Sequence, residues 1–276
     1  MSWRATLDLD YSRPHHKTLV HFRHIGPLRI LQSLYPEGDA VCHNVLIHPP
    51  GGLVGGDTLE INIKVQGQAH GLLTTPGATR FYRSSSEPAE QALHAHLAAG
   101  ARLEWLPLET IAFNLCNARN KAVFQLDPGA EMLGWDVTAL GLPSSNLPFV
   151  QGNFSQHLEL SGVWREQACL DGTDHRLLDG ALGLAGKRCL ATLFFLSGKP
   201  IVPERRELAL AQARSLMNNH PLQMSSGATC PNPQVMLVRV LSDRVEPALN
   251  LLKALRASWR HSMWGMQAPA PRTWAT

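Results

Sequence analysis

Apolar and polar residues alternate in short runs over most of the first two hundred positions of the chain. In residues 59–65 the odd positions are leucine, isoleucine and valine, and the even positions are glutamate, asparagine and lysine. A period of two is typical of a strand with one buried face. The same pattern predicts further strands over residues 18–25, 72–75, 91–97, 102–106, 122–126, 131–137 and 156–164.

A weak internal repeat accompanies the turns between these strands. An apolar residue followed closely by glycine and alanine recurs as VQGQA at residues 65–69, LAAGA at 97–101 and LDPGA at 126–130. The starts are about 30 residues apart, an interval that fits stacked layers of strands. Chance recurrence of common turn residues explains the repeat almost as well. We use it to favour a layered β architecture over a sandwich.

Helical patterns are confined to the last third of the chain. Pro203 with acidic residues directly after it predicts a helix that ends near Asn219. A second helix is predicted over residues 243–259, where apolar residues recur on one face. Residues 235–241 between them resemble a strand buried on both faces. No linker divides the sequence, so we predict one mainly β domain over residues 1–276 with two C-terminal helices.

Composition and charge exclude several classes of protein. The chain is 44% hydrophobic and can bury a large core, whereas its net charge of +3 and 17% charged residues do not suit a nucleic-acid binder. Five scattered cysteines without a Cys-x-x-Cys pair fit neither a disulfide framework nor a zinc site, so we expect reduced thiols. The N-terminus lacks a secretory signal, and the most apolar stretch, residues 190–196, is far shorter than the roughly 20 residues that span a membrane. We therefore expect a cytoplasmic protein that does not bind membranes.

The densest motif is the run HPPGGLVGGD at residues 48–57. Its glycines have the spacing of a phosphate-binding loop, but Asp57 stands where that loop requires lysine. A carboxylate there would repel the phosphates that the ammonium holds. Composition alone favours a glycine-rich bend between two strands.

This run and several later segments together resemble the UreD family of urease accessory proteins. The matching segments follow in the family's order and span nearly the whole chain: GPL at 26–28, YPEG at 35–38, CH at 42–43, LTTPGATRFYRS at 73–84, LEWLP at 103–107, ETI at 109–111 and PRTWAT at 271–276. One such motif is weak, whereas this many in order are specific. The departures are Asn114, Leu115 and Cys116, where the family has a small Gly-Ala pair, and residues 142–149, which lack the family's Arg and Glu.

The resemblance implies a fold, a role and a set of partners. The fold is a right-handed β-helix-like stack of short strands with two C-terminal helices, and the role is not enzymatic. UreD-type proteins bind urease apoprotein, pair with the UreF adaptor and recruit the UreG GTPase through it. They assist the delivery of Ni²⁺ along an internal polar passage, so the resemblance implies transient Ni²⁺ and no tightly bound cofactor.

Four residues are candidates for metal transfer or for lining a polar passage: His48, Asp57, Glu104 and Glu109. Weak and scattered oxygen and nitrogen ligands suit transfer, because a closed four-ligand site would trap the ion, so no tight metal site is predicted. Glu104 and Glu109 flank an apolar Trp-Leu-Pro segment, where a buried paired carboxylate is one reading and an exposed strand end is the simpler one.

Four other residues are candidates for a partner interface: Arg80, Tyr82, Arg83 and Asp136. The first three form a small basic and aromatic group after a Pro-Gly turn, a composition common at interfaces and also at solvated hairpin ends. Asp136 falls on the strand face opposite to Trp135, so it points away from any core that contains this tryptophan.

Two other functions stay open. One is a metal-dependent hydrolase that uses His48, Asp57 and either His94 or His96, which share one face of a predicted strand. The other is a β-structured scaffold without a role in metal transfer, which the departure at residues 142–149 keeps in contention.

Overall fold

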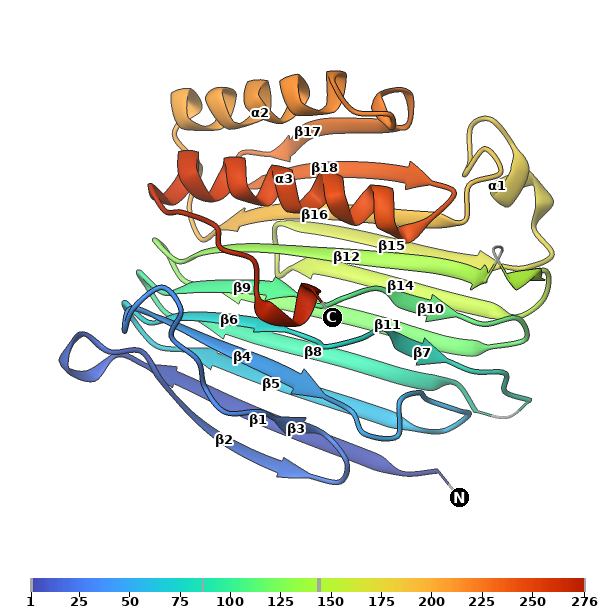
Figure 1. The fold of residues 1–276 in the computed structure, drawn as a ribbon, viewed down its shortest axis with the longest axis horizontal. Coiled ribbons are helices and arrows are strands. Elements are labelled where there is room, and N and C mark those ends of the chain that lie inside the picture. The colour runs from blue at the N-terminus through green and yellow to red at the C-terminus, as the bar shows by residue number, and fades with distance from the viewer. Residues whose placement is uncertain (1, 86, 143–144, 276) are drawn as a thin grey trace.

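The computed structural model describes residues 2–85, 87–142 and 145–275, so Pro143 and Ser144 of the divergent segment lie outside the described residues. Over these residues the chain forms two large β-sheets in face-to-face layers, and helices near the C-terminus cover the outer face of one of them (Figure 1).

The first layer is a seven-stranded sheet with the order β15-β14-β11-β8-β5-β1-β2. The five central strands run parallel, and an antiparallel strand flanks them at each edge. Its members are β1 (Arg4–Ser12), β2 (Leu19–Ile25), β5 (Thr58–Val65), β8 (Ala89–Leu97), β11 (Asn117–Leu126), β14 (Asn153–Leu160) and β15 (Trp164–Asp171).

The second layer is an eleven-stranded sheet whose main path runs β17-β18-β16-β12-β9-β6-β4-β3, with three short strands attached beside β12. Its members are β3 (Arg29–Ile30), β4 (Val41–Ile47), β6 (His70–Thr74), β7 (Thr79–Phe81), β9 (Arg102–Leu106), β10 (Thr110–Ala112), β12 (Glu131–Leu142), β13 (Leu147–Pro148), β16 (Cys189–Ser197), β17 (Ser226–Asn232) and β18 (Val235–Ser242).

The chain passes alternately between the two sheets from β4 to β14, which confirms the β-helix-like stack. Parallel strands β4, β6, β9 and β12 lie in one sheet, and β5, β8, β11 and β14, to which the chain passes after each of them, lie in the other. The short strands β7, β10 and β13 come before these crossings and belong to the same sheet as β4, β6, β9 and β12. The recurring Gly-Ala turns are the corners of successive coils. Ala98 N donates to Val65 O, and Asp127 N donates to Leu97 O, each at 2.9 Å. The repeat of about 30 residues therefore reflects one coil of the solenoid.

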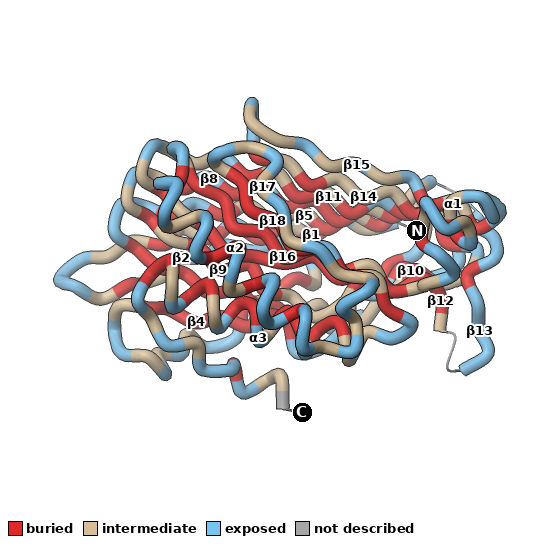
Figure 2. The backbone as a smooth tube through the Cα atoms, turned by 90° about the horizontal axis from the view of Figure 1, so that it is seen from above, coloured by how far each residue is buried: buried red, intermediate tan, exposed pale blue. Residues whose placement is uncertain are grey.

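The core has two parts, one on each side of the larger sheet. Side chains from both sheets meet between the layers, and a second cluster lies between the larger sheet and the helices. Figure 2 shows buried positions running along the strands of both layers. The predicted helices are confirmed as α2 (Pro203–Asn218) and α3 (Val245–Trp264), and a short α1 (His175–Asp179) lies in a connection. Gly265 caps the C-terminus of α3, and its φ of +66° suits a residue without a Cβ.

The predicted strands coincide with β2, β5, β6, β8, β9, β11 and β12 apart from their end residues. The strand predicted over residues 156–164 is confirmed over residues 156–160, which belong to β14, and is wrong beyond them, because the chain turns at Gly162, with φ of +72°, and returns antiparallel as β15. All five cysteines are free thiols, as expected. Among the described helices, none is long and apolar enough to cross a membrane.

Candidate functional site

A ladder of amide side chains crosses the apolar interior between the two sheets. Asn120 on β11 is in register with Gln91 on β8 and with Gln156 on β14, so the three side chains lie side by side on adjacent strands. Gln91 Nε2 donates to Asn120 Oδ1 at 3.2 Å. Their neighbours of the same parity, such as Leu93 and Ala122, are buried apolar residues. We call Gln91, Asn120, Gln156 and Asp136 the polar seam.

Asp136 reaches this ladder from β12 in the opposite sheet. Asn120 Nδ2 donates to Asp136 Oδ2 at 3.0 Å, Thr138 Oγ1 donates to Oδ1 at 3.1 Å, and Gln156 Nε2 also donates to Oδ1. The carboxyl group is 9% exposed, and burial raises its pKa to about 6 although the hydrogen bonds from Thr138 and Asn120 oppose this shift. A carboxyl group that is half ionised at about pH 6 therefore lies in the interior of the solenoid.

The prediction that Asp136 belongs to a partner interface is wrong. The strand face of Asp136 was predicted correctly, because Trp135 lies in the cluster under the helices and Asp136 points to the opposite face of β12. The face opposite Trp135 is covered by the seven-stranded sheet instead of solvent. Strands buried on both faces are usually recognised by a continuous apolar run, and the polar residue Asp136 interrupts that run in β12.

The end of the seam at Gln91 opens into a cavity of about 290 Å³. His48, Thr79, Arg80 and Gln91 are among its lining residues. The imidazole of His48 packs against Trp3 with ring centroids 4.9 Å apart, and its buried Nε2 atom has no hydrogen-bond partner among the described residues. Burial lowers the pKa of His48 more than the nearby Asp57 carboxylate raises it, so the imidazole is neutral.

Asp57 is buried and holds the glycine-rich loop together. Its Oδ2 accepts a hydrogen bond from Val54 N at 3.0 Å, and its Oδ1 accepts one from Trp3 N at 3.2 Å. Both donors are backbone groups, so the carboxylate fixes the bend and the N-terminal segment. A backbone-capping role explains this geometry. Its role in metal transfer stays a prediction.

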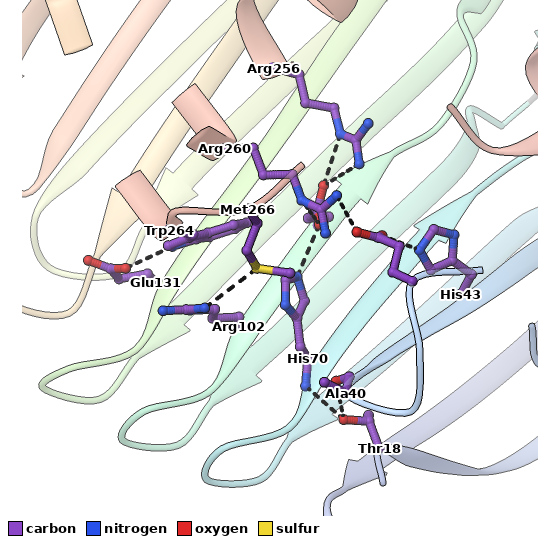
Figure 3. A network of polar contacts seen from close by, with 12 residues as sticks. Thr18, Ala40, His43, His70, Arg102, Glu131, Arg256, Arg260, Trp264 and Met266 are labelled. Carbon is purple, nitrogen blue, oxygen red and sulfur yellow. Dashed lines mark hydrogen bonds and ion pairs between the residues drawn. The ribbon is translucent and has the colours of Figure 1, made fainter. Parts of the chain in front are cut away.

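Glu104 lies at the centre of a buried ion-pair network beneath α3, on the opposite face of the larger sheet from the polar seam. Its Oε2 accepts from Arg256 Nε at 2.9 Å, and its Oε1 lies 3.0 Å from both Arg260 Nε and His70 Nε2. Figure 3 shows the two arginines converging from one helix on this point. Burial alone would raise the pKa of Glu104, but the Arg256 guanidinium and the hydrogen bond from His70 outweigh it and hold the pKa well below its usual range.

The same network extends to a second carboxylate. Arg260 Nη1 lies 2.7 Å from Glu37 Oε2, and Glu37 Oε1 lies 2.7 Å from His43 Nε2. The charges of two carboxylates and two guanidinium groups therefore balance in this network. Burial lowers the pKa of His70. The network attaches α3 to β9 and to the loop before β4. The exposed-strand-end interpretation of Glu104 was wrong, and the paired-carboxylate interpretation is confirmed.

The four residues predicted for metal transfer do not form one site. His48 and Asp57 are neighbours at the glycine-rich loop, whereas Glu104 lies beneath α3. Glu109 is partly buried and accepts a hydrogen bond from Thr79 N at its backbone oxygen. Burial raises the pKa of the Cys189 thiol, and the Glu109 carboxylate adds to this shift. His94 and His96 are exposed on the outer face of β8. Across the described ranges, no three His, Cys, Asp or Glu side chains are grouped closely enough to hold a metal.

Arg80, Tyr82 and Arg83 are exposed beside the glycine-rich loop, and their role at a partner interface stays a prediction. Leu53 N donates to Arg80 O at 2.7 Å, and Tyr82 N donates to Leu53 O at 2.9 Å, so the two segments form one surface. Sequence reasoning missed Gln91, Asn120 and Gln156. The available signal was an amide at a position whose neighbours of the same parity are apolar.

The fold and the site define a two-sheet β-solenoid with a polar seam inside it. The whole chain between residues 4 and 275 matches the family model described as UreD urease accessory protein. A "Urease accessory protein UreD" of Paracidovorax citrulli is 57% identical over 275 residues, and one of Variovorax paradoxus is 56% identical over 276 residues; each comparison covers both chains completely. This chain therefore belongs to the UreD family of urease accessory proteins, and its role lies in urease maturation.

Proposed function

We propose that this chain binds urease apoprotein together with the UreF adaptor, recruits the UreG GTPase through UreF, and lets Ni²⁺ pass to urease through the polar seam. Membership of the UreD family supports the maturation role. The observation that carries the passage is Asp136, a carboxyl group placed among amide side chains where an apolar core would otherwise close the interior.

The ligands in the polar seam suit the passage of a divalent cation better than its tight binding. Its donors are one carboxylate and several neutral amide oxygens, which bind a divalent cation weakly when no third or fourth strong ligand is close. A pKa of about 6 lets Asp136 release its proton when a cation arrives, because the cation favours the charged form. The neutral imidazole of His48 supplies a nitrogen ligand in the cavity at the Gln91 end.

The far side of the seam reaches the surface between β15 and β18. Glu166 on β15 contributes to the raised pKa of Asp136 and forms an ion pair with Arg239 on β18. Both side chains are partly exposed, with 31% and 47% of their surface accessible. In this proposal the His48 cavity and the Glu166 edge are the two ends of the route.

A scaffold without transport is the second candidate. One observation favours it: both Asp136 oxygens already accept hydrogen bonds, as in a polar network that serves only packing. The metal-dependent hydrolase has no comparable support, because His94 and His96 lie on the outer face of β8. The proposal therefore retains a non-enzymatic, cytoplasmic role in which GTP hydrolysis belongs to the partner.

Asn120→Leu separates transport from scaffolding, because leucine has about the same size as asparagine but cannot offer an amide to the seam. Urease apoprotein is co-expressed with the accessory proteins and with wild-type chain, the variant or no chain. The proposal requires that the variant co-purifies with urease and the adaptor while nickel per urease falls toward the value without the chain. Full nickel loading with Asn120→Leu would favour the scaffold, and loading that needs no chain at all would reject the maturation role.

A further inference from the structure

Helix α2 lies on the outside of the molecule, at the top of Figure 1. Its buried residues join the cluster between the larger sheet and the helices: Ala209, Leu210, Ala213 and Met217. Seven exposed residues occupy the opposite side: Glu204, Glu207, Leu208, Ala211, Arg214, Ser215 and Asn218. Six of them stand three, four or seven positions before or after Ala211, so all seven lie on one face of the helix. We call these seven residues the α2 face.

The charges of the α2 face are separated along the helix. Glu204 and Glu207 lie in its N-terminal half, and Arg214 lies in its C-terminal half. Arg214 Nη2 donates to Ala228 O at 3.3 Å, but none of the three forms an ion pair with another residue that the structure describes. Exposed helices are commonly stabilised by opposite charges four residues apart, and this face has no such pair. Its electrostatic complement is therefore the same face in the reverse direction.

An antiparallel copy of α2 supplies that complement by symmetry. A two-fold axis through Ala211 brings Glu207 of one helix beside Arg214 of the second copy, and Leu208 beside Ser215 of the second copy. With a rise of about 1.5 Å per residue, Glu207 lies about 6 Å from the axis and Arg214 of the second copy about 4.5 Å from it on the same side. Their levels thus differ by only about 1.5 Å, and the symmetry repeats the ion pair at the other end.

The size of the side chains also suits a helix pair. Ala211 places a single methyl group at the crossing point, so the two axes can approach to roughly 8 Å. Leu208 is 53% exposed and would pack over the small side chain of Ser215. A parallel pair would instead place Glu207 beside Glu207, so the flanking charges determine an antiparallel arrangement.

We propose that the α2 face is the surface through which two copies of this chain associate, with their α2 helices antiparallel around Ala211. The occupant is a second copy of this chain because the face is complementary to itself in charge and in size. α2 has 16 residues and is about 24 Å long, so the interface is small and the association is expected to be reversible in the micromolar range. This inference goes beyond the proposed function and requires nothing of the polar seam.

The test exchanges the two charges singly and together in the full chain. Sedimentation velocity at low salt, over about 1–100 μM protein, measures the dissociation constant of the dimer. Glu207→Arg and Arg214→Glu each bring like charges together at both ends of the pair, so each should raise that constant at least about tenfold. The double variant restores two opposite pairs and should return it to within about threefold of wild type. Arg176→Glu on α1 is the matched control, because it makes the same change of charge at an exposed arginine away from α2 and should leave association unchanged.

The charges of the α2 face also suit the dipole of the helix, which favours acids near the N-terminus and bases near the C-terminus. A role confined to the dipole predicts the opposite result for the double variant. That protein would melt below either single variant, and its dissociation constant would not return toward the wild-type value.

A second measurement does not depend on charge. Ala211→Cys places a thiol next to its own copy at the axis, so mild oxidation should yield a disulfide-linked dimer. Asn218→Cys, at the end of the same face, should yield far less, and oxidised wild type accounts for the exposed thiol of Cys169. Wild-type chain that stays monomeric up to about 100 μM would overturn the proposal. Single exchanges without effect on association, or equal cross-linking at positions 211 and 218, would overturn it as well.

Discussion

Replacing Asp136 by asparagine should raise the free energy of unfolding above that of wild type. This gain should be larger at alkaline pH than at acid pH. Burial raises the pKa of this carboxyl group from 3.8 to about 6 in the folded protein. A raised pKa means that the folded state holds the proton more tightly than the unfolded chain. Wild type therefore loses stability as the pH rises from about 4 to about 6, and the full penalty is present above that range. Two pH units correspond to about 3 kcal/mol.

The asparagine variant has no such penalty, because it carries no ionisable group at this position. The amides of Asn120 and Gln156 can reverse their orientation to donate to or accept from the new side chain. Urea unfolding of both proteins at pH 5 and pH 8 measures the effect. The difference in unfolding free energy, variant minus wild type, should increase by about 1–1.5 kcal/mol between these two values, because about half of the penalty is already present at pH 5. Parallel pH profiles for the two proteins would refute a buried carboxyl group with a raised pKa.

Three other predictions concern the residues singled out in the sequence. Glu104→Gln should lower the unfolding free energy by about 3–5 kcal/mol, because Arg256 and Arg260 would be left without their buried carboxylate; an unchanged urea midpoint would contradict the network. Asp57→Ala should cost about 1–3 kcal/mol for each backbone donor left unsatisfied, and the fraction that remains folded should load urease with nickel normally. Lower nickel loading by fully folded Asp57→Ala would return this residue to the transfer route. The purified chain should not hydrolyse GTP above a buffer blank, and any turnover abolished by Asp57→Ala would contradict its non-enzymatic role.

Alternation of residue types was sufficient to predict the strands that have one half-buried face. β5 is an example, because its apolar positions face the other sheet and its polar positions face outward. The method failed at two strands that are covered on both faces, whereas the continuous apolar run of residues 235–241 identified β18, which is also largely buried. β4 and β16 are buried along nearly their whole length, and their sequences show no alternation. Recognition of the family supplied the overall architecture that periodicity could not.

The candidate site was less predictable than the fold, because its residues come together only through the stacking of coils. Gln91 and Asn120 are 29 residues apart, close to one coil of the solenoid, and such a pairing requires knowledge of the register. Glu104 was recognised as an acid among apolar neighbours, but its partner Arg256 lies 152 residues further along the chain. No local pattern reports a contact of that kind.

The function of Asp57 illustrates the same limit. Its place at the end of a glycine-rich motif suggested a functional carboxylate, and sequence alone could not show that two backbone N–H groups point at it. His48, nine residues earlier, keeps a buried nitrogen without a partner among the described residues. Of the two motif residues, His48 therefore has the geometry of a ligand and Asp57 that of a cap.

The nickel content of urease matured with the Asp136→Asn variant tests the central claim most directly. Urease apoprotein, the adaptor and the GTPase are co-expressed with wild-type chain, with Asp136→Asn or with Asp127→Asn, a matched substitution of an exposed carboxylate on the outer surface. Nickel per urease is then measured by elemental analysis after equal recovery of the complex has been verified. The account predicts normal loading with Asp127→Asn and a marked loss with Asp136→Asn, although the latter protein is the more stable at pH 8. Equal nickel content with both variants, in complexes that form normally, would contradict passage through the polar seam.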